Sequence, residues 1–244
     1  MEQIYNVILN ENDLSDYDDD YILKQADLKA IVQKNTKNGV IDGDAIINEI
    51  FNSKPDYDIF ISYSHKDQKL AKRLANFLDQ EFGLFVFLDC DFWQSSDDLL
   101  KEIDNKYCLN EDKKTYDYKK RNFSTSHIHA MLSASIVKTI ASSKVCFFLN
   151  TKNSISSLDS TIVKKTLSPW IFEEITVAKY LINNTNKKNR VLLEDAKELA
   201  VDYTLPLNGS QILNSSSLNF WLNKYRNNSK KALDILFSLH FHTT

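Results

Sequence analysis

The chain has 244 residues, 43% of them apolar, and its 30 basic and 33 acidic residues leave a formal charge of −3. This length suffices for one substantial core with extensions and is short for two large domains. The near balance of charge gives no net attraction to phosphate backbones or anionic lipid, so neither nucleic acid nor a membrane is the expected partner. No apolar run approaches the roughly 20 residues that cross a bilayer. The three cysteines are widely spaced, which is typical of a soluble protein of the reducing cytoplasm.

The first 54 residues are expected to form a helical extension ahead of the main domain. Residues 11–20 are dominated by Asp, Asn and Glu, a composition that solvates rather than packs and predicts a loose acidic loop. The apolar pattern then predicts a helix from Tyr21 to Lys34 and a shorter amphipathic helix from Asp44 to Phe51. Pro55 ends this extension.

From residue 55 to about residue 210, short apolar runs alternate with helical patterns. The continuous apolar runs at 59–61, 85–88 and 145–149 are typical of parallel strands that helices cover on both faces. Residues 201–207 are a weaker candidate for a fourth strand. Residues 67–81, after the first run, carry apolar side chains at helical spacing. The sequence therefore predicts an α/β domain with a doubly wound, flavodoxin-like parallel sheet.

The second and third predicted strands are separated by more sequence than one crossover helix needs. Ser95 or Ser96 is expected to cap a helix there, and residues 130–141 to form a second helix, with an insertion at about 108–126 between them. Residues 211–244 are expected to form a C-terminal extension of one or two helices.

Polar and aromatic residues follow each of the predicted strands. Because ligands of open parallel sheets bind outside the carboxyl ends of the strands, these residues are expected at a functional edge. Ser168 as N-cap and Pro169 at the first position predict a helix that places Trp170 and Glu174 on one face, at i and i+4. The residues that follow the strands are Ser62, Tyr63, Ser64 and His65 after the first, Asp89, Cys90, Asp91, Phe92 and Trp93 after the second, and Asn150 and Thr151 after the third.

Three of these segments together resemble a TIR (Toll/interleukin-1 receptor) domain of the bacterial stand-alone type. They are the stretch YDIFISYS at 57–64 with Asp67 after it, the stretch VFLD at 86–89, and the stretch SPW at 168–170. In the third, Trp170 stands four residues before Glu174. The similarity covers residues 57–207. The insertion further resembles TIR proteins of bacterial antiphage systems such as Thoeris.

This resemblance implies cleavage of NAD⁺ between nicotinamide and ribose, with Glu174 as the catalytic residue and NAD⁺ as substrate rather than cofactor. The chemistry is consistent with one carboxylate, because nicotinamide leaves from a cationic pyridinium and needs no proton, whereas ordinary glycoside hydrolysis uses two carboxyl groups. The aromatic faces of Tyr63 and Trp170 could contact the nicotinamide cation. The substrate-binding residues expected on this basis are Ser62, Tyr63, Ser64, His65, Asp89, Asp91, Trp93 and Trp170.

The product expected from this resemblance is ADP-ribose or a cyclic or conjugated derivative of it. We expect the product to act on a separate effector protein and the enzyme to form a homo-oligomer on activation. A second hypothesis is a non-catalytic TIR scaffold that acts by TIR–TIR assembly. It stays open because residues 91–98, expected to form the loop after the second strand, lack the Pro-Gly turn common in the family, so a self-association surface there could be reshaped.

Other kinds of site find less support. Asp89 and Asp91 flank Cys90, yet no further ligand stands at metal-site spacing, so no metal is expected. Without a Gly-rich phosphate loop, kinase, NTPase and Rossmann dehydrogenase functions are not expected. Without the resemblance, Trp170 would be assigned to the core and Glu174 to a solvated helix face; Glu173 remains a surface residue in either interpretation.

Overall fold

The computed structural model describes residues 1–20, 28–38, 40–50, 57–88, 90–156, 164–184, 203–228 and 230–242. The chain forms two compact units, each built from discontinuous segments. Unit 1 comprises Met1–Tyr21, Pro55–Leu88 and Ile140–Thr244, and unit 2 comprises Ile22–Lys54 and Asp89–Thr139.

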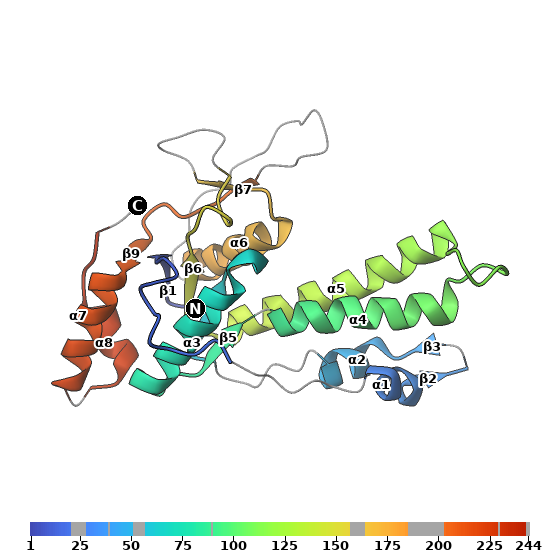
Figure 1. The fold of residues 1–244 in the computed structure, drawn as a ribbon, viewed down its shortest axis with the longest axis horizontal. Coiled ribbons are helices and arrows are strands. Elements are labelled where there is room, and N and C mark those ends of the chain that lie inside the picture. The colour runs from blue at the N-terminus through green and yellow to red at the C-terminus, as the bar shows by residue number, and fades with distance from the viewer. Residues whose placement is uncertain are drawn as a thin grey trace. The chain divides into compact units, whose positions relative to one another are not determined.

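Unit 1 is built on a five-stranded sheet in which every pairing is parallel (Figure 1). The strand order is β5-β4-β6-β1-β9, which makes the unit an α/β structure consistent with a flavodoxin-like fold. The predicted runs at 59–61, 85–88 and 145–149 are confirmed as neighbouring strands of this sheet. The strands are β1 (Gln3–Ile8), β4 (Ile59–Ser62), β5 (Val86–Leu88), β6 (Val145–Leu149) and β9 (Gln211–Asn214).

The sheet extends beyond the predicted range of 55–210, which is a correction to the predicted organisation. β1 belongs to the segment 1–54 that was expected to be a helical extension, and it lies between β6 and β9 in the sheet. β9 belongs to the segment 211–244 that was expected to hold only helices. The N-terminal strand occupies a central position because its apolar side chains are buried on both faces: Ile4, Tyr5 and Val7 are each at most 2% exposed.

The predicted fourth strand at 201–207 is also corrected. The structure describes only its second part, in which β8 (Tyr203–Thr204) pairs antiparallel with β7 (Lys165–Thr166), outside the central sheet. Residues 201 and 202 lie outside the described part of the chain. A run as short as β8 has too few ladder hydrogen bonds to compete with β1 for the place beside β6.

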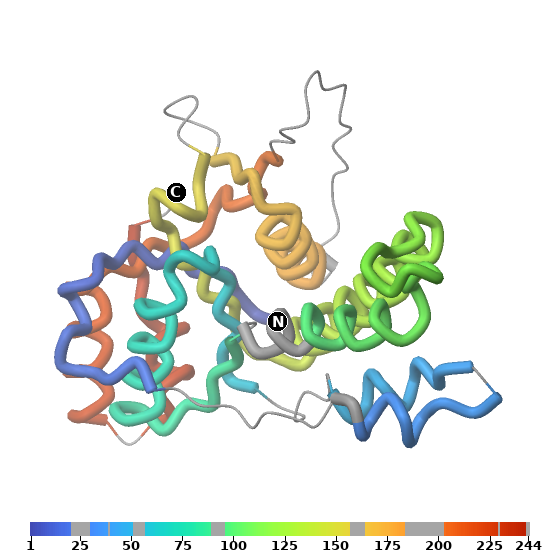
Figure 2. The backbone as a smooth tube through the Cα atoms, turned by 45° about the vertical axis from the view of Figure 1, so that its right-hand side comes forward, coloured from blue at the N-terminus to red at the C-terminus, as the bar shows by residue number. Residues whose placement is uncertain are grey.

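Helices cover both faces of the sheet (Figure 2). Side chains alternate between the faces along each strand, and Tyr5 and Phe147 share one of them, with ring centroids 5.6 Å apart. On this face the Tyr5 hydroxyl reaches the Leu236 carbonyl oxygen at 3.5 Å. The helices on this side are α3 (Gln68–Phe82), α7 (Ser215–Arg226) and α8 (Ala232–Ser238), and α6 (Pro169–Asn184) covers the other face, where it contacts β1 and β4.

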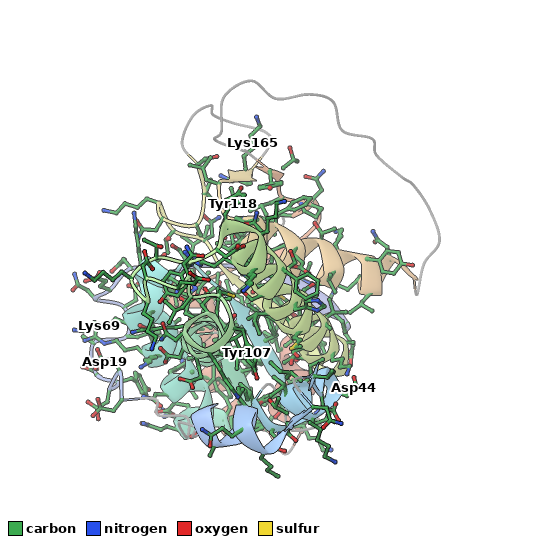
Figure 3. All side chains as sticks on the ribbon, turned by 90° about the vertical axis from the view of Figure 1, so that its right-hand side faces the viewer. Asp19, Asp44, Lys69, Tyr107, Tyr118 and Lys165 are labelled. Carbon is green, nitrogen blue, oxygen red and sulfur yellow. The ribbon has the colours of Figure 1, made fainter. Side chains whose placement is uncertain are left out.

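The helix predicted at 67–81 is confirmed as α3, and its end shows why it stops there. Gly83 adopts a left-handed conformation with φ of 62°, and its N–H donates to the Asp79 carbonyl oxygen, as glycine does at many helix C-termini. On the surface of the same helix, Lys69 lies beside Asp19 at 3.6 Å (Figure 3). The acidic segment 11–20, predicted as a loop, consists of turns and bends.

Unit 2 consists mainly of helices. The prediction of a helix at 21–34 is met by α1 over the described residues, 21–27 lying outside them. Two long helices lie side by side (Figure 1), and Tyr107 and Tyr118 lie at the end where a short connection joins them (Figure 3). The elements are α1 (Leu28–Lys34), β2 (Thr36–Lys37), β3 (Val40–Ile41), α2 (Gly43–Ile50), α4 (Cys90–Tyr107) and α5 (Tyr118–Ser142), whose last residues belong to unit 1.

Both long helices begin earlier in the sequence than predicted. α4 begins at Cys90, so Ser95 and Ser96 lie inside the helix instead of capping it. α5 begins at Tyr118, so the predicted insertion at 108–126 is reduced to a loop closed by a bridge between Leu109 and Tyr116. The polar segment after Tyr118 is helical because its apolar residues, Ile128 and Leu132 among them, are buried at i, i+4 spacing.

Among the residues that the structure describes, no helix is both long and apolar enough to cross a membrane.

Candidate functional site

The centre of the candidate site is a hydrogen bond between Ser62 and Glu174. The Ser62 hydroxyl donates to Oε2 of Glu174 at 2.7 Å. Ser62 ends β4 and is fully buried, and the Glu174 side chain on α6 is only 1% exposed. Burial of a carboxylate is costly unless hydrogen bonds satisfy it. The structure therefore joins two residues that the sequence predicted separately, at the carboxyl end of the sheet.

The start of α6 fixes the position of Glu174. The Ser168 hydroxyl accepts a hydrogen bond from the Ile171 N–H at 3.3 Å, and Pro169 takes the first helical position, which confirms the predicted cap. Ile171 is buried and lies one helical turn before Glu174 and Ile175, so the same face of the helix carries both its packing residues and the carboxylate.

The Ser62–Glu174 pair lies at the point where the order of the strands in the sheet reverses. β4 leads through α3 to β5 on one side, whereas β6 leads through α6 to β9 on the other. In doubly wound sheets ligands bind at such a switch point. Ser62 pairs in register with Phe148 of β6, so Glu174 is held above the two strands that flank this point.

Cys146 is a further buried group close to the carboxylate. It lies in β6, is fully buried, and is in register with Phe60 on the face of the sheet that carries Ser62. Burial raises the pKa of the Cys146 thiol strongly, and the negative charge of Glu174 raises it further. The thiol is therefore a protonated neighbour of Glu174 and not a nucleophile.

A second cluster ties together the loops that follow β4 and β6. Asp67, at the end of the 3₁₀ turn His65–Asp67, accepts from the Thr151 hydroxyl at 2.5 Å and from the Asn153 side-chain amide at 2.7 Å. The Ser154 hydroxyl in turn donates to the Leu149 carbonyl oxygen at 2.9 Å. These bonds hold the two loops that border the switch point in one arrangement.

A buried amide pair continues the polar layer to the third strand of this face. Asn6 of β1 is 1% exposed and is in register with Phe148, as Ser62 is from the other side. Its side-chain oxygen accepts from the Asn150 side-chain amide at 2.8 Å. Polar side chains thus occur at the carboxyl ends of three adjacent strands, β4, β6 and β1.

The remaining predicted site residues have different surroundings. Tyr63 is buried directly after β4, Ser64 and Trp170 are partly exposed, and His65 is exposed. Asp89 lies outside the described residues, and so do the side chains of Asp91 and Trp93. The backbone of residues 91 and 93 belongs to the first turns of α4 instead of the expected loop. Glu173 is partly exposed, as expected for a residue outside the site.

Sequence reasoning did not assign roles to Asn6, Cys146 or Asp67. Asn6 is a polar residue inside an apolar stretch, which is a usable signal once that stretch is assigned to a buried strand. Asp67 stood in the TIR-like segment, but its partners come from a loop far along the chain. Within the described residues no three His, Cys, Asp or Glu side chains gather in a way that could hold a metal ion.

The arrangement can hold one carboxylate in a fixed position in a site of low polarity. Electrostatic interactions are stronger in such surroundings than in water, so a negative charge there can stabilise a cationic transition state effectively. Ser62 fixes one carboxylate oxygen of Glu174. The hydrogen bonds around Asp67 fix the backbone of the two loops that follow β4 and β6.

Comparison with known proteins adds no relative, since no family model, no curated protein and no solved structure matches this chain.

Proposed function

We propose that the protein is a TIR-type NAD⁺ nucleosidase in which Glu174 is the catalytic residue. The observation that carries this proposal is the Ser62–Glu174 hydrogen bond of 2.7 Å at the switch point of the sheet. It is supported by the sequence resemblance, in which the glutamate four residues after Trp170 has this role. The reaction converts NAD⁺ and water to nicotinamide, ADP-ribose and a proton.

The proposed mechanism needs one carboxylate. The bond between ribose C1′ and the pyridinium nitrogen breaks, its electron pair returns to the nicotinamide ring, and the ribose develops oxocarbenium character. In this proposal Ser62 holds Oε2, while Oε1 accepts a hydrogen bond from a ribose hydroxyl and the negative charge stabilises the cationic sugar. Trp170 and Tyr63 would contact the nicotinamide ring, and Ser64 and His65 the ribose or phosphate groups.

The burial of Glu174 bears on how the enzyme would be controlled. A carboxylate that is 1% exposed cannot meet a dinucleotide until surrounding groups move. We therefore propose that the chain as described is a resting state, and that activation, accompanied by homo-oligomer formation, opens the site. Such gating is common where an active site must be closed to water or to premature turnover.

The partners of this activity are part of the same proposal. NAD⁺ is an intracellular metabolite, so the enzyme would act in the cytoplasm, and antiphage defence is the setting that the resemblance suggests. The ADP-ribose-derived product, whether linear, cyclic or conjugated, would be recognised by a separate effector protein.

The first experiment measures nicotinamide release from NAD⁺ by the full chain and by Glu174→Gln, each with and without extracts of infected cells as trigger. Gln keeps the size of the side chain and a hydrogen-bond acceptor for Ser62, but removes the charge. We expect a loss of about 100-fold to 1,000-fold, the size found when one transition-state contact is removed. Glu173→Gln is the matched control and should retain activity, because it makes the same charge change one residue away.

Equal nicotinamide release by the wild type and Glu174→Gln, with both proteins folded, would contradict the assignment. The alternative of a non-catalytic scaffold is tested with the same variants in cells, since a scaffold keeps its effect when Glu174 is replaced. The segment 91–98 on which that alternative depended is helical, within α4, and so does not form the expected loop. A scaffold would therefore have to assemble through a helix at this place, and the variants in cells distinguish the two hypotheses.

A further inference from the structure

Unit 2 contains a pocket that is separate from the proposed NAD⁺ site. None of the residues proposed to contact NAD⁺ lies in its wall. Its volume is about 630 Å³, and every residue that lines it belongs to unit 2. Small-molecule sites in proteins usually have volumes of roughly 300–1,000 Å³ and mainly apolar walls. The apolar lining residues include Val40, Ile41, Ile46, Ile103, Phe123, Ile128 and Met131.

The floor of the pocket is packed, whereas its rim leaves apolar groups open to solvent. Ile46 and Ile128 are almost fully buried, but Val40 is 70% and Phe123 69% exposed. The Phe123 ring is held edge-on by His127, with centroids 4.4 Å apart. Apolar side chains that line a concave site and remain exposed at its rim are a sign of a binding surface.

Cationic and polar groups accompany the apolar wall on one side. Lys119, Lys120 and His127, all from α5, line the pocket. Burial and Asp104 raise the pKa of the thiol of Cys108, another lining residue, whereas the Ser124 hydroxyl and, more weakly, the positive charge of Lys120 lower it. Lys120 therefore contributes positive potential inside the pocket.

Asp104, whose hydrogen-bond partner Ser124 also lines the pocket, is already compensated. Asp104 is 3% exposed and accepts hydrogen bonds from Nε of Arg121 at 2.8 Å and from the Ser124 hydroxyl at 2.6 Å. Arg121 neutralises Asp104, and Asp117 accepts a hydrogen bond from the backbone N–H of Lys120 at 2.9 Å at the start of α5. Because both acids already have partners, the ammonium groups of the two lysines can meet an anionic group of a ligand. A ligand that fits both features has an apolar body and one negative charge.

We propose that this pocket binds a small amphipathic anion, specifically an acyl carboxylate, with its chain among Ile46, Ile103 and Ile128 and its carboxylate at Lys119 and Lys120. A neutral apolar ligand would leave the two lysines unused, and a partner helix would lie across a longer groove than this volume represents. The site is independent of the NAD⁺ chemistry proposed for Glu174.

The test uses sodium decanoate as probe and the full chain labelled with ¹³C at isoleucine δ1 and methionine ε methyl groups. Titration should shift the methyl signals of Ile46, Ile103, Ile128 and Met131 saturably, and leave those of Ile59 and Ile61 in β4 unchanged. The second pair reports on unit 1, so it separates binding at the pocket from general detergent-like effects.

Two matched double variants test the role of charge. Lys119→Gln with Lys120→Gln should weaken decanoate binding about tenfold, which corresponds to about 1.4 kcal/mol, and should leave decanol binding unchanged. Lys113→Gln with Lys114→Gln removes the same charge from the exposed loop before α5 and should leave both affinities unchanged. All four lysines are exposed, so neither double variant threatens folding.

Three results of the binding measurements would overturn the proposal. They are the absence of saturable methyl shifts at millimolar decanoate, shifts confined to unit 1, and equal binding of decanoate, decanol and decylammonium by wild type and the Lys119/Lys120 variant. A sedimentation experiment tests the alternative that a second copy of the chain covers the pocket. A concentration-dependent dimer that decanoate does not dissociate would support that alternative and would also overturn the proposal.

Discussion

The two units differ in what they enclose. Unit 1 closes its apolar core around a parallel sheet and buries polar groups at one edge of it, including Ser62, Asn6 and Glu174. Unit 2 buries a smaller apolar interior and leaves a pocket of about 630 Å³ with an open apolar rim. Buried polar groups are costly and suggest chemistry, whereas open apolar surface suggests binding. The difference therefore separates a candidate reaction site from a candidate ligand site.

Each unit also buries a carboxylate beside a serine, and the comparison shows why burial alone does not indicate function. In unit 2, Asp104 accepts from Ser124 and is paired with Arg121, whose side chain is half exposed. That arrangement is typical of a structural ion pair. In unit 1, Glu174 accepts from Ser62 at the switch point of the sheet and acts electrostatically on the Cys146 thiol. Location and surroundings distinguish the two.

The largest expected effect is on stability, and it tests whether the core of unit 1 is closely packed while the pocket rim of unit 2 is open. Phe147 is fully buried at the centre of β6, so Phe147→Ala should lower the free energy of unfolding by about 3–5 kcal/mol through lost burial and a cavity. Phe123→Ala, at the open rim of the pocket, should change it by less than about 0.5 kcal/mol. Urea denaturation followed by circular dichroism measures both. Similar losses for the two variants would mean that the pocket rim is packed in solution.

The next effect compares the two serine–carboxylate pairs. Ser62→Ala removes a donor from the buried Glu174 and should cost about 1–3 kcal/mol, the range for leaving a buried polar group unsatisfied. Ser124→Ala should cost less, about 1 kcal/mol, because Arg121 continues to satisfy Asp104. Double-mutant cycles with Glu174→Gln and Asp104→Asn isolate the two pair energies. A stronger coupling at Ser124 than at Ser62 would reverse the distinction between the two carboxylates.

The smallest effect is a dependence on pH. Because folding raises the pKa of the Cys146 thiol, the native state keeps a proton that the unfolded chain loses above about pH 8.5. The contribution of this thiol to stability is complete below that pH and declines above it, by at most about 1.4 kcal/mol per pH unit. Cys146→Ala should therefore flatten the decline of the unfolding free energy between pH 8 and pH 10.

Cys108→Ala is the matched comparison in unit 2. Burial raises the pKa of Cys108 as well, and Asp104 adds to this effect, but Ser124 and Lys120 lower that pKa, so the flattening should be smaller. If the two variants change the slope equally, the surroundings of Cys146, its burial first and the charge of Glu174 second, do not raise its pKa more than those of Cys108 do.

Much of unit 1 could be predicted from local sequence. β4, β5 and β6 are continuous apolar runs, and α3 and α6 show helical spacing with a clear cap at Ser168. β1 and β9 were missed for a physical reason. β1 contains Asn6 within its apolar residues and pairs with strands that are distant in the sequence, while β9 has only two apolar residues, Ile212 and Leu213. Such pairings depend on tertiary contacts that no local pattern encodes.

Sequence reasoning placed the candidate site residues at one edge of the sheet but gave no geometry for them. Ser62 and Glu174 were assigned to one edge from strand order and helix spacing, and the structure adds the bond between them. The segment 91–98 looked like a loop because its aspartates and serines favour turns, yet it is helical. Helix formation there depends on packing of Leu99 and Ile103, both buried, which lies beyond the turn signals.

The central position of β1 has a consequence for how the protein is made. β1 precedes both of its partners in the chain, because it pairs with β6 at residues 145–149 and with β9 at residues 211–214. During translation β1 can pair with β6 only after residue 149 has been synthesised, and with β9 only after residue 214. The five-stranded sheet is therefore complete only late in synthesis, and a short deletion from residue 3 to residue 8 would separate β9 from the other strands instead of trimming the edge of the sheet.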